Sequence, residues 1–251
     1  MSLRETHPRL SVVIPLYNEA GCLGSNIVLL DDYLRSLKLA YELVLVDDGS
    51  TDSTRRICCD IVGRNLFAHL ISYSKNRGKG YAVKTGVLNS AGRYIIFTDA
   101  DLAVPVRFIG KCLRRLEGGT PVVIGSRHLP ESSFRVREDP LRQVLGEIFR
   151  RFARASLGLR VSDITCGLKG FEKKAAFDIF SRSRIDRWGY DAEVIFLARK
   201  LGLPIEEIPV DWYHSFDSKV KVGAASAGTL VEILQIYYYY LFDHYHLSKT
   251  A

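Results

Sequence analysis

The sequence predicts an α/β fold with a Rossmann-like, mostly parallel central sheet and flanking helices. Two observations lead to this prediction. Short apolar runs alternate with segments of helical periodicity over residues 10–126. The chain has 251 residues, of which 47% are hydrophobic and 25% charged, as expected for a large folded domain. Strands that alternate with helices pair in parallel through right-handed crossovers, so these segments are expected to share one sheet.

The first part of the chain contains three strand signals separated by helix signals. Residues 10–16 form an apolar run, and leucine and isoleucine then recur at helical spacing over residues 23–37. A second apolar run covers residues 41–46, and the polar residues 50–52 supply N-cap side chains for the helix that follows. Residues 66–73 are expected to form the third strand.

The same alternation continues through two more strands. Residues 80–88 are expected to be helical, and residues 93–98 form the fourth strand. The next helix is expected to begin at Pro105, because proline suits the first turn of a helix. Residues 121–125 form the fifth strand.

The alternation becomes irregular after residue 127. A polar loop is expected over residues 128–140, followed by a basic amphipathic helix over residues 141–157. A further helix is expected near 190–201 and a strand near 204–212.

The chain is expected to form one domain over residues 8–215, followed by a C-terminal tail over residues 216–251. The tail mixes aliphatic residues with four consecutive tyrosines, Tyr237–Tyr240. Tyrosine favours the membrane–water interface, so the tail is consistent with an aromatic, amphipathic helix lying on a bilayer. A dimer contact and packing onto the domain are the alternatives.

The net charge and the cysteine content limit which partners and which cellular compartment are expected for this protein. The net charge of +7 is compatible with phosphorylated substrates, an anionic membrane surface or simply a solvated basic surface. Nucleic-acid binding would rest on this charge alone and is not expected. The five cysteines include no CxxC pair, which indicates reduced thiols. Neither a signal peptide nor an apolar span of about 20 residues is visible, so a cytoplasmic protein is expected.

Two acidic clusters follow predicted strands. Asp47 and Asp48 come after the second strand, and Asp99 and Asp101 come after the fourth. Grouped carboxylates repel one another and raise each other's pKa, a cost that a divalent cation or a donor-rich ligand relieves. Ligands of open α/β sheets bind beyond the carboxyl ends of the strands. The clusters therefore indicate an enzyme that handles a metal ion and a nucleotide, with a solvated acidic turn as the alternative.

Two common nucleotide-binding motifs are absent. A GxGxxG fingerprint would follow the first strand, where the chain instead has Pro-Leu-Tyr-Asn-Glu at 15–19. The segment Asn-Arg-Gly-Lys-Gly at 76–80 lacks the GxxxxGK[ST] spacing of a P-loop. A Rossmann dehydrogenase and a P-loop NTPase are therefore not expected.

Five segments in this order resemble a family 2 glycosyltransferase with a GT-A fold. In chain order they are Pro-Leu-Tyr-Asn-Glu at 15–19, Asp-Asp-Gly-Ser-Thr-Asp at 47–52, Asn-Arg-Gly-Lys-Gly at 76–80, Thr-Asp-Ala-Asp-Leu at 98–102 and Gly-Ser-Arg at 125–127. Three later segments are similar to the dolichyl-phosphate glucosyltransferase branch, which is close to the dolichyl-phosphate mannosyltransferases. These later segments are 163–171, 187–193 and 217–220.

The resemblance implies a nucleotide-sugar site. In it, Glu19 and Asp48 would hold the base or ribose, and Lys79 would contact the base or the phosphates. One carboxylate of the second cluster would ligate Mg²⁺ or Mn²⁺, since such hard ions prefer oxygen ligands, while the other would meet the ribose or sugar. The full set implied is Pro15, Tyr17, Glu19, Asp47, Asp48, Lys79, Asp99, Ala100 and Asp101, with Asp99 and Asp101 as the candidate metal ligands.

The acceptor decides which further residues are needed. A lipid monophosphate is largely ionised at neutral pH and needs cations rather than a general base. Arg127 and Arg142 are the candidates, because guanidinium groups match phosphate geometry. The resemblance assigns the same role to these two arginines and to Lys219. Arg142 also fits a solvated basic face. A hydroxyl acceptor would need a general base, for which Asp191 and Glu193 are the candidates.

The predicted function is an inverting transfer of a hexose onto a polyprenyl phosphate at the cytosolic face of a membrane. The donor is expected to be UDP-glucose, with GDP-mannose as the alternative. The predicted catalytic set is Asp99, Asp101, Arg127, Arg142 and Asp191. Two other functions stay open: a transferase acting on a saccharide or protein hydroxyl, and a non-catalytic nucleotide-sugar-binding protein.

Overall fold

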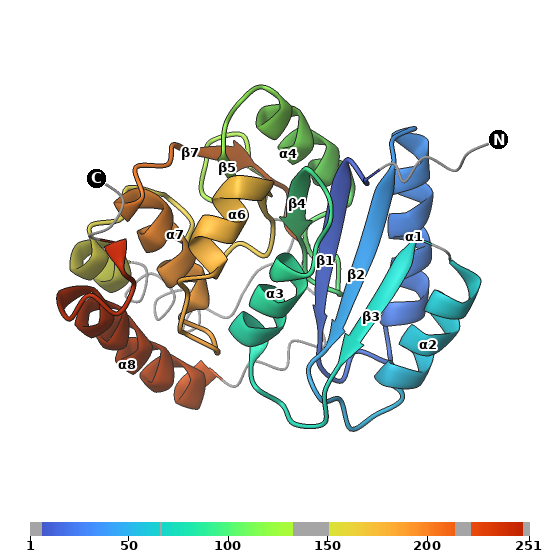
Figure 1. Cartoon of the computed structure of the whole chain (residues 1–251), viewed down its shortest axis with the longest axis horizontal. Helices are drawn as coiled ribbons and strands as arrows, with labels where there is room; N and C mark the ends of the chain where they lie inside the picture. The colour runs from blue at the N-terminus through green and yellow to red at the C-terminus, as the bar shows by residue number, and fades with distance from the viewer. Residues whose placement is uncertain (1–6, 66, 133–150, 214–221, 248–251) are drawn as a thin grey trace.

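The computed structural model describes residues 7–65, 67–132, 151–213 and 222–247 (Figure 1). Within these residues, seven strands form one sheet in the order β3-β2-β1-β4-β6-β5-β7. The strands are β1 (Leu10–Leu16), β2 (Tyr41–Asp47), β3 (Ala68–Ser72), β4 (Tyr94–Phe97), β5 (Val122–Ser126), β6 (Lys169–Glu172) and β7 (Ile205–Pro209). β6 is antiparallel to both of its neighbours, and the other pairings are parallel. The predicted fold class, a mostly parallel sheet with flanking helices, is confirmed.

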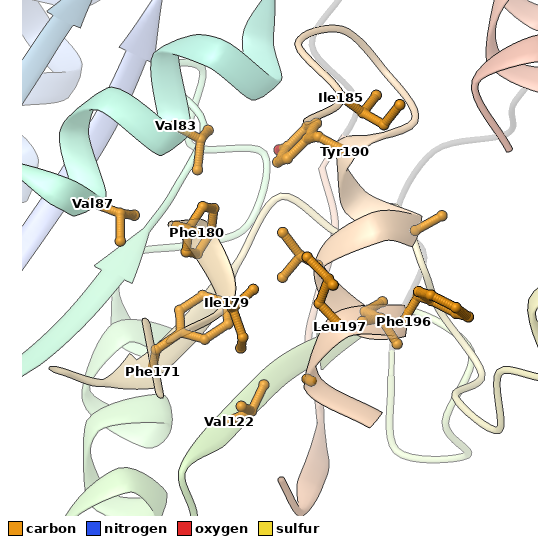
Figure 2. Packing of buried hydrophobic residues seen from close by; sticks show 14 of the residues in the cluster. Val83, Val87, Val122, Phe171, Ile179, Phe180, Ile185, Tyr190, Phe196 and Leu197 are labelled. Atoms are coloured by element: carbon orange, nitrogen blue, oxygen red, sulfur yellow. The ribbon is translucent and has the colours of Figure 1, made fainter. Parts of the chain in front are cut away.

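Helices cover both faces of the sheet and bury two apolar clusters. The helices are α1 (Leu23–Ser36), α2 (Thr54–Arg64), α3 (Lys79–Leu88), α4 (Arg107–Glu117), α6 (Lys173–Phe180), α7 (Tyr190–Lys200) and α8 (Val222–Leu241). One cluster joins the sheet to α1 and α4, and the other joins it to α3, α6 and α7. Figure 2 shows the second cluster, in which Val83, Phe180 and Leu197 come from three different helices. Burial on both faces explains why β1 and β2 are almost continuously apolar.

Neither β6 nor α6 is predicted from the sequence. β6 has only four residues and begins Lys-Gly, so neither alternation nor an apolar run marks it. Its pairing with β4 and β5 comes from distant parts of the chain. The expected basic helix over 141–157 is helical over the described residues 151–157, and its earlier part lies outside the described residues.

The C-terminal segment packs on the domain through one side of α8. Ile233, Ile236 and Tyr245 are fully buried in the same cluster as α7. The other side of the helix is apolar yet exposed, and consists of Leu230, Val231, Leu234, Tyr237, Tyr238 and Leu241, followed by Phe242. None of the described helices is both long enough and apolar enough to cross a membrane.

Candidate active site

The residues predicted to bind the nucleotide sugar lie where β1, β2 and β4 end, with Lys79 at the start of α3. The chain runs from β1 through β2 to β3 on one side, and β4 then lies on the other side of β1. In open α/β sheets, ligands bind at such a reversal, in the crevice beyond the carboxyl ends of the strands. Tyr17 follows β1, Asp48 follows β2, and Asp99 and Asp101 follow β4. The topology therefore brings both acidic clusters to one edge of the sheet.

The carboxylates of the first acidic cluster accept hydrogen bonds from backbone N–H groups of neighbouring loops. Asp48 is buried, and its carboxylate accepts hydrogen bonds from Arg77 N at 2.8 Å and Gly78 N at 2.9 Å. Asn76 Nδ2 donates a third bond at 2.8 Å. Asp47 Oδ1 accepts a bond from Ser50 N at 3.1 Å. In this structure Asp48 thus fixes the 76–78 loop, and nucleoside contact by Asp48 stays a prediction.

The residues after β1 form the rim of the crevice. Pro15 is buried within the strand, whereas the Tyr17 side chain is exposed. The Glu19 N–H donates to Thr54 Oγ1 at 2.8 Å, which ties the rim to the start of α2. Asp52 Oδ1 accepts a bond from Thr54 N at 2.9 Å. Asp52 therefore holds the first residue of α2 in place.

Lys79 joins the second cluster from the first turn of α3. Its Nζ lies 2.7 Å from Asp99 Oδ1 and 5.7 Å from the centre of the exposed Trp188 ring. Burial acts to lower the pKa of Lys79, but the charges of Asp99 and Asp191 outweigh it and raise that pKa. The cation is therefore held charged beside Asp99. Contact of Lys79 with the base or the phosphates stays a prediction.

Asp99 and Asp101 have the donor chemistry of a divalent-cation site. The loss of surrounding water and the charge of Asp99 raise the pKa of Asp101. Asp101 Oδ1 also accepts a bond from Ala103 N at 3.0 Å. The described residues contain no group of three or more His, Cys, Asp or Glu side chains placed to hold a metal. Two carboxylates fit a magnesium-like ion that takes its remaining oxygens from phosphates and water.

Two neighbouring backbone segments support this cluster. Ala100 is buried, and its carbonyl oxygen accepts a bond from Asn26 Nδ2 at 2.8 Å. Gly167 lies against the Asp99 carboxylate, since a Cβ placed on it would be 2.2 Å from Asp99 Oδ2. A side chain at residue 167 would therefore displace Asp99.

Arg127 lies at the end of β5 with its guanidinium paired to a buried carboxylate. Its Nε and Nη2 donate to the two oxygens of Asp163 at 2.7 and 2.9 Å, and Nη2 also donates to Thr165 Oγ1 at 2.8 Å. Burial would raise the pKa of Asp163, but hydrogen bonds and charge from Arg127 lower it well below its usual range. Arg142 and Lys219 lie outside the described residues. Acceptor binding by these three cations stays a prediction.

Asp191 is buried at the start of α7 and paired with Lys169, a residue that the sequence analysis did not single out. Lys169 Nζ lies 2.5 Å from Asp191 Oδ1 and donates to the Cys166 carbonyl oxygen at 2.8 Å. Burial raises the pKa of Asp191, and Lys169 partly offsets that rise. Glu193 accepts bonds from Arg184 N and Ile185 N at 2.8 and 3.0 Å. Both rival base candidates thus hold neighbouring chain segments together.

Sequence reasoning missed Asp163 and Lys169, although both lie in the 163–171 segment that the resemblance marked. Their burial, which shows that they need partners, appears only in the structure, so the sequence offered no signal beyond this segment.

Comparisons with known proteins identify the family of this chain. The family model "Glycosyl transferase family 2" matches residues 11–180. The dolichyl-phosphate beta-glucosyltransferase of Dictyostelium discoideum is 34% identical over 247 residues, covering 92% of this chain and 75% of that protein. The corresponding Saccharomyces cerevisiae protein is 32% identical, with 96% and 78% covered. The human protein is 34% identical, with 84% and 69% covered.

Solved structures support the same fold. Glucosyl-3-phosphoglycerate synthase from Mycobacterium tuberculosis in complex with UDP superimposes with a TM-score of 0.69 at 20% identity, covering 91% of this chain and 80% of that one. Another crystal structure of that synthase contains Mn²⁺, UDP and glucosyl-3-phosphoglycerate. Given the family match, the relatives and the shared architecture, the chain belongs to glycosyl transferase family 2 and is a glycosyltransferase with a GT-A fold.

Proposed function

We propose that this enzyme transfers glucose from UDP-glucose to the phosphate of a polyprenyl phosphate of the dolichyl type, with inversion at the anomeric carbon. The observation that carries the proposal is the similarity to dolichyl-phosphate beta-glucosyltransferases, which extends over 84% to 96% of the chain in three organisms. The UDP and Mn²⁺ of a structural neighbour are consistent with a UDP-sugar donor and a divalent ion.

The donor is proposed to lie in the crevice at the ends of β1, β2 and β4. Tyr17 and Glu19 at the rim face the nucleoside, while Lys79 meets the diphosphate. Asp99 and Asp101 would hold Mg²⁺ or Mn²⁺, which when bound neutralises negative charge on the leaving diphosphate. The Lys79 ammonium, 2.7 Å from Asp99 Oδ1, adds a fixed positive charge on the same side.

The acceptor is proposed to react without a general base. An ionised phosphate oxygen of the lipid attacks the anomeric carbon, and the bond from that carbon to the diphosphate oxygen breaks, so that UDP leaves with the electron pair. Arg127, held by Asp163, is proposed to orient the acceptor together with Arg142 and Lys219. The hydroxyl-acceptor alternative is disfavoured by the burial of its candidate base, Asp191, against Lys169.

The lipid acceptor requires that the enzyme work at a membrane surface. The exposed apolar side of α8, with Leu234, Tyr238 and Phe242, suits contact with the interfacial region of a bilayer. We therefore place the enzyme at the cytosolic face of a membrane as a peripheral protein, which is the position from which it would reach a lipid headgroup.

A transfer assay tests the proposal. Purified protein is incubated with Mn²⁺, a polyprenyl phosphate and radiolabelled UDP-glucose or GDP-mannose. Label is expected to pass from UDP-glucose into the organic phase and to be lost in Asp101→Ala. Transfer of label to water or to a soluble sugar alone would contradict the lipid acceptor, and label from GDP-mannose alone would contradict the donor.

A further inference from the structure

The segment 184–190 separates the donor site from the C-terminal part of the chain. It connects α6 to α7 and carries Trp188, whose ring lies near Lys79. The mechanism above gives this segment no role, yet both of its sides make specific contacts.

One side of the segment supports the loop that presents Lys79. Tyr81 N donates to the Asp186 carbonyl oxygen at 2.9 Å. Gly78 has φ of +116°, and a Cβ on it would be 2.4 Å from Asp186 O, while a Cβ on Gly80 would be 2.6 Å from Ile185 O. The residues on both sides of Lys79 therefore rest directly on this backbone. A shift of the segment would move the Lys79 ammonium.

The other side of the segment is held by the C-terminal part of the chain. Glu232 of α8 accepts a bond from Gly189 N at 2.7 Å. Tyr245 OH donates at 2.7 Å to Glu193, the carboxylate that also accepts bonds from Arg184 N and Ile185 N. Arg184 itself donates to the His244 carbonyl oxygen through Nε at 2.9 Å and Nη2 at 2.6 Å.

We propose that Glu232 and Tyr245 are positioning residues for the donor site. They act through the 184–190 segment, and they set the places of Lys79 and Trp188 although neither touches the donor. The inference rests on the proposed function in taking a UDP-sugar as the donor. It gives the C-terminal part of the chain a role in donor binding that is separate from its exposed apolar side.

The first test measures UDP binding by calorimetry in the presence of Mn²⁺. Glu232→Ala removes the acceptor of the Gly189 N–H, and a hydrogen bond of this kind is worth roughly a tenfold change in an equilibrium constant. We expect the Kd for UDP to rise by about that factor. Glu232→Gln keeps an oxygen acceptor and is expected to bind UDP nearly as well as the wild type.

Tyr245→Phe removes only the hydroxyl and is expected to raise the same Kd a few-fold, roughly. Tyr237→Phe, on the exposed side of α8, is the matched control and is expected to leave the Kd unchanged. Thermal melts of all four variants check that they fold.

A second readout needs neither activity nor a nucleotide. The chain has two tryptophans, so Trp212→Phe leaves Trp188 as the only one. In that background we expect acrylamide to quench Trp188 more strongly in Glu232→Ala than in Glu232→Gln. Wild-type Kd values together with unchanged quenching in Glu232→Ala and Tyr245→Phe would overturn the positioning role. Failure of the wild type to bind UDP would instead overturn the proposed donor, and the quenching comparison would still decide this inference.

Discussion

Replacing Lys169 with methionine would leave the Asp191 carboxylate buried without its cation. The Lys169 side chain has no exposed surface, and its Nζ lies 2.5 Å from Asp191 Oδ1 and 2.8 Å from the Cys166 carbonyl oxygen. Removing one partner of a buried ion pair costs about 3–5 kcal/mol, because the remaining charge is uncompensated. A typical domain has only about 5–15 kcal/mol of stability. We therefore expect Lys169→Met to lower the free energy of unfolding by about 3 kcal/mol or more.

Urea unfolding followed by circular dichroism at neutral pH measures this loss. The series comprises the wild type, Lys169→Met, Asp191→Leu and the double variant. The double variant is expected to regain most of the lost stability, because an apolar pair often replaces a buried ion pair at little cost. A loss below about 1 kcal/mol in Lys169→Met would refute the reasoning, as would a double variant that loses the sum of the two single losses.

Three further predictions concern the carboxylates Asp99 and Asp101, the Arg127–Asp163 pair and helix α8. Gly167→Ala is expected to displace Asp99 and lower kcat/KM by about 100-fold in the transfer assay, whereas Gly24→Ala, with open space at its Cβ, is the matched control. The pKa of Asp163 is lowered below 3.8 in the folded state, so the unfolded state binds the proton at a higher pH than the folded state does. The stability that this carboxylate contributes is therefore lost as the pH falls below 3.8. The melting temperature is expected to drop in acid less steeply for Asp163→Asn than for the wild type, and equal slopes would contradict this. Leu234→Ser is expected to weaken co-sedimentation with anionic vesicles by roughly tenfold, whereas Leu29→Ser, an equally exposed leucine on α1, should not.

The strands that carry the site could be predicted from the sequence because they are buried on both faces. β1, β2 and β4 read as apolar runs, and aspartates mark the ends of β2 and β4, so local pattern and final position agree. β6 could not be predicted in this way. Its residues 169–172 become a strand only through pairing with β4 and β5, which lie more than 40 residues earlier in the chain. Local propensity carries no information about such pairing.

The candidate site likewise contains residues that the local sequence predicts and partners that it does not predict. The carboxylates and Lys79 were predictable because they follow strand ends or a glycine-rich turn. The partners of Arg127 and Asp191 were not, because Asp163 and Lys169 are 36 and 22 residues away from them. Two residues predicted to act on a ligand, Arg127 and Asp191, therefore meet partners within the chain.

The two acidic clusters relieve their repulsion in different ways, and this difference indicates where a cation is needed. At Asp48 the donors come from the protein, since two backbone N–H groups and the Asn76 amide surround the carboxylate. Asp99 and Asp101 have Lys79 and one backbone N–H between them in the contacts described above, and the pKa of Asp101 remains raised. Binding of a divalent ion is therefore more favourable at Asp99 and Asp101 than at Asp48. The first cluster orders the loop that carries Lys79, and we propose that the second binds the ion and the diphosphate.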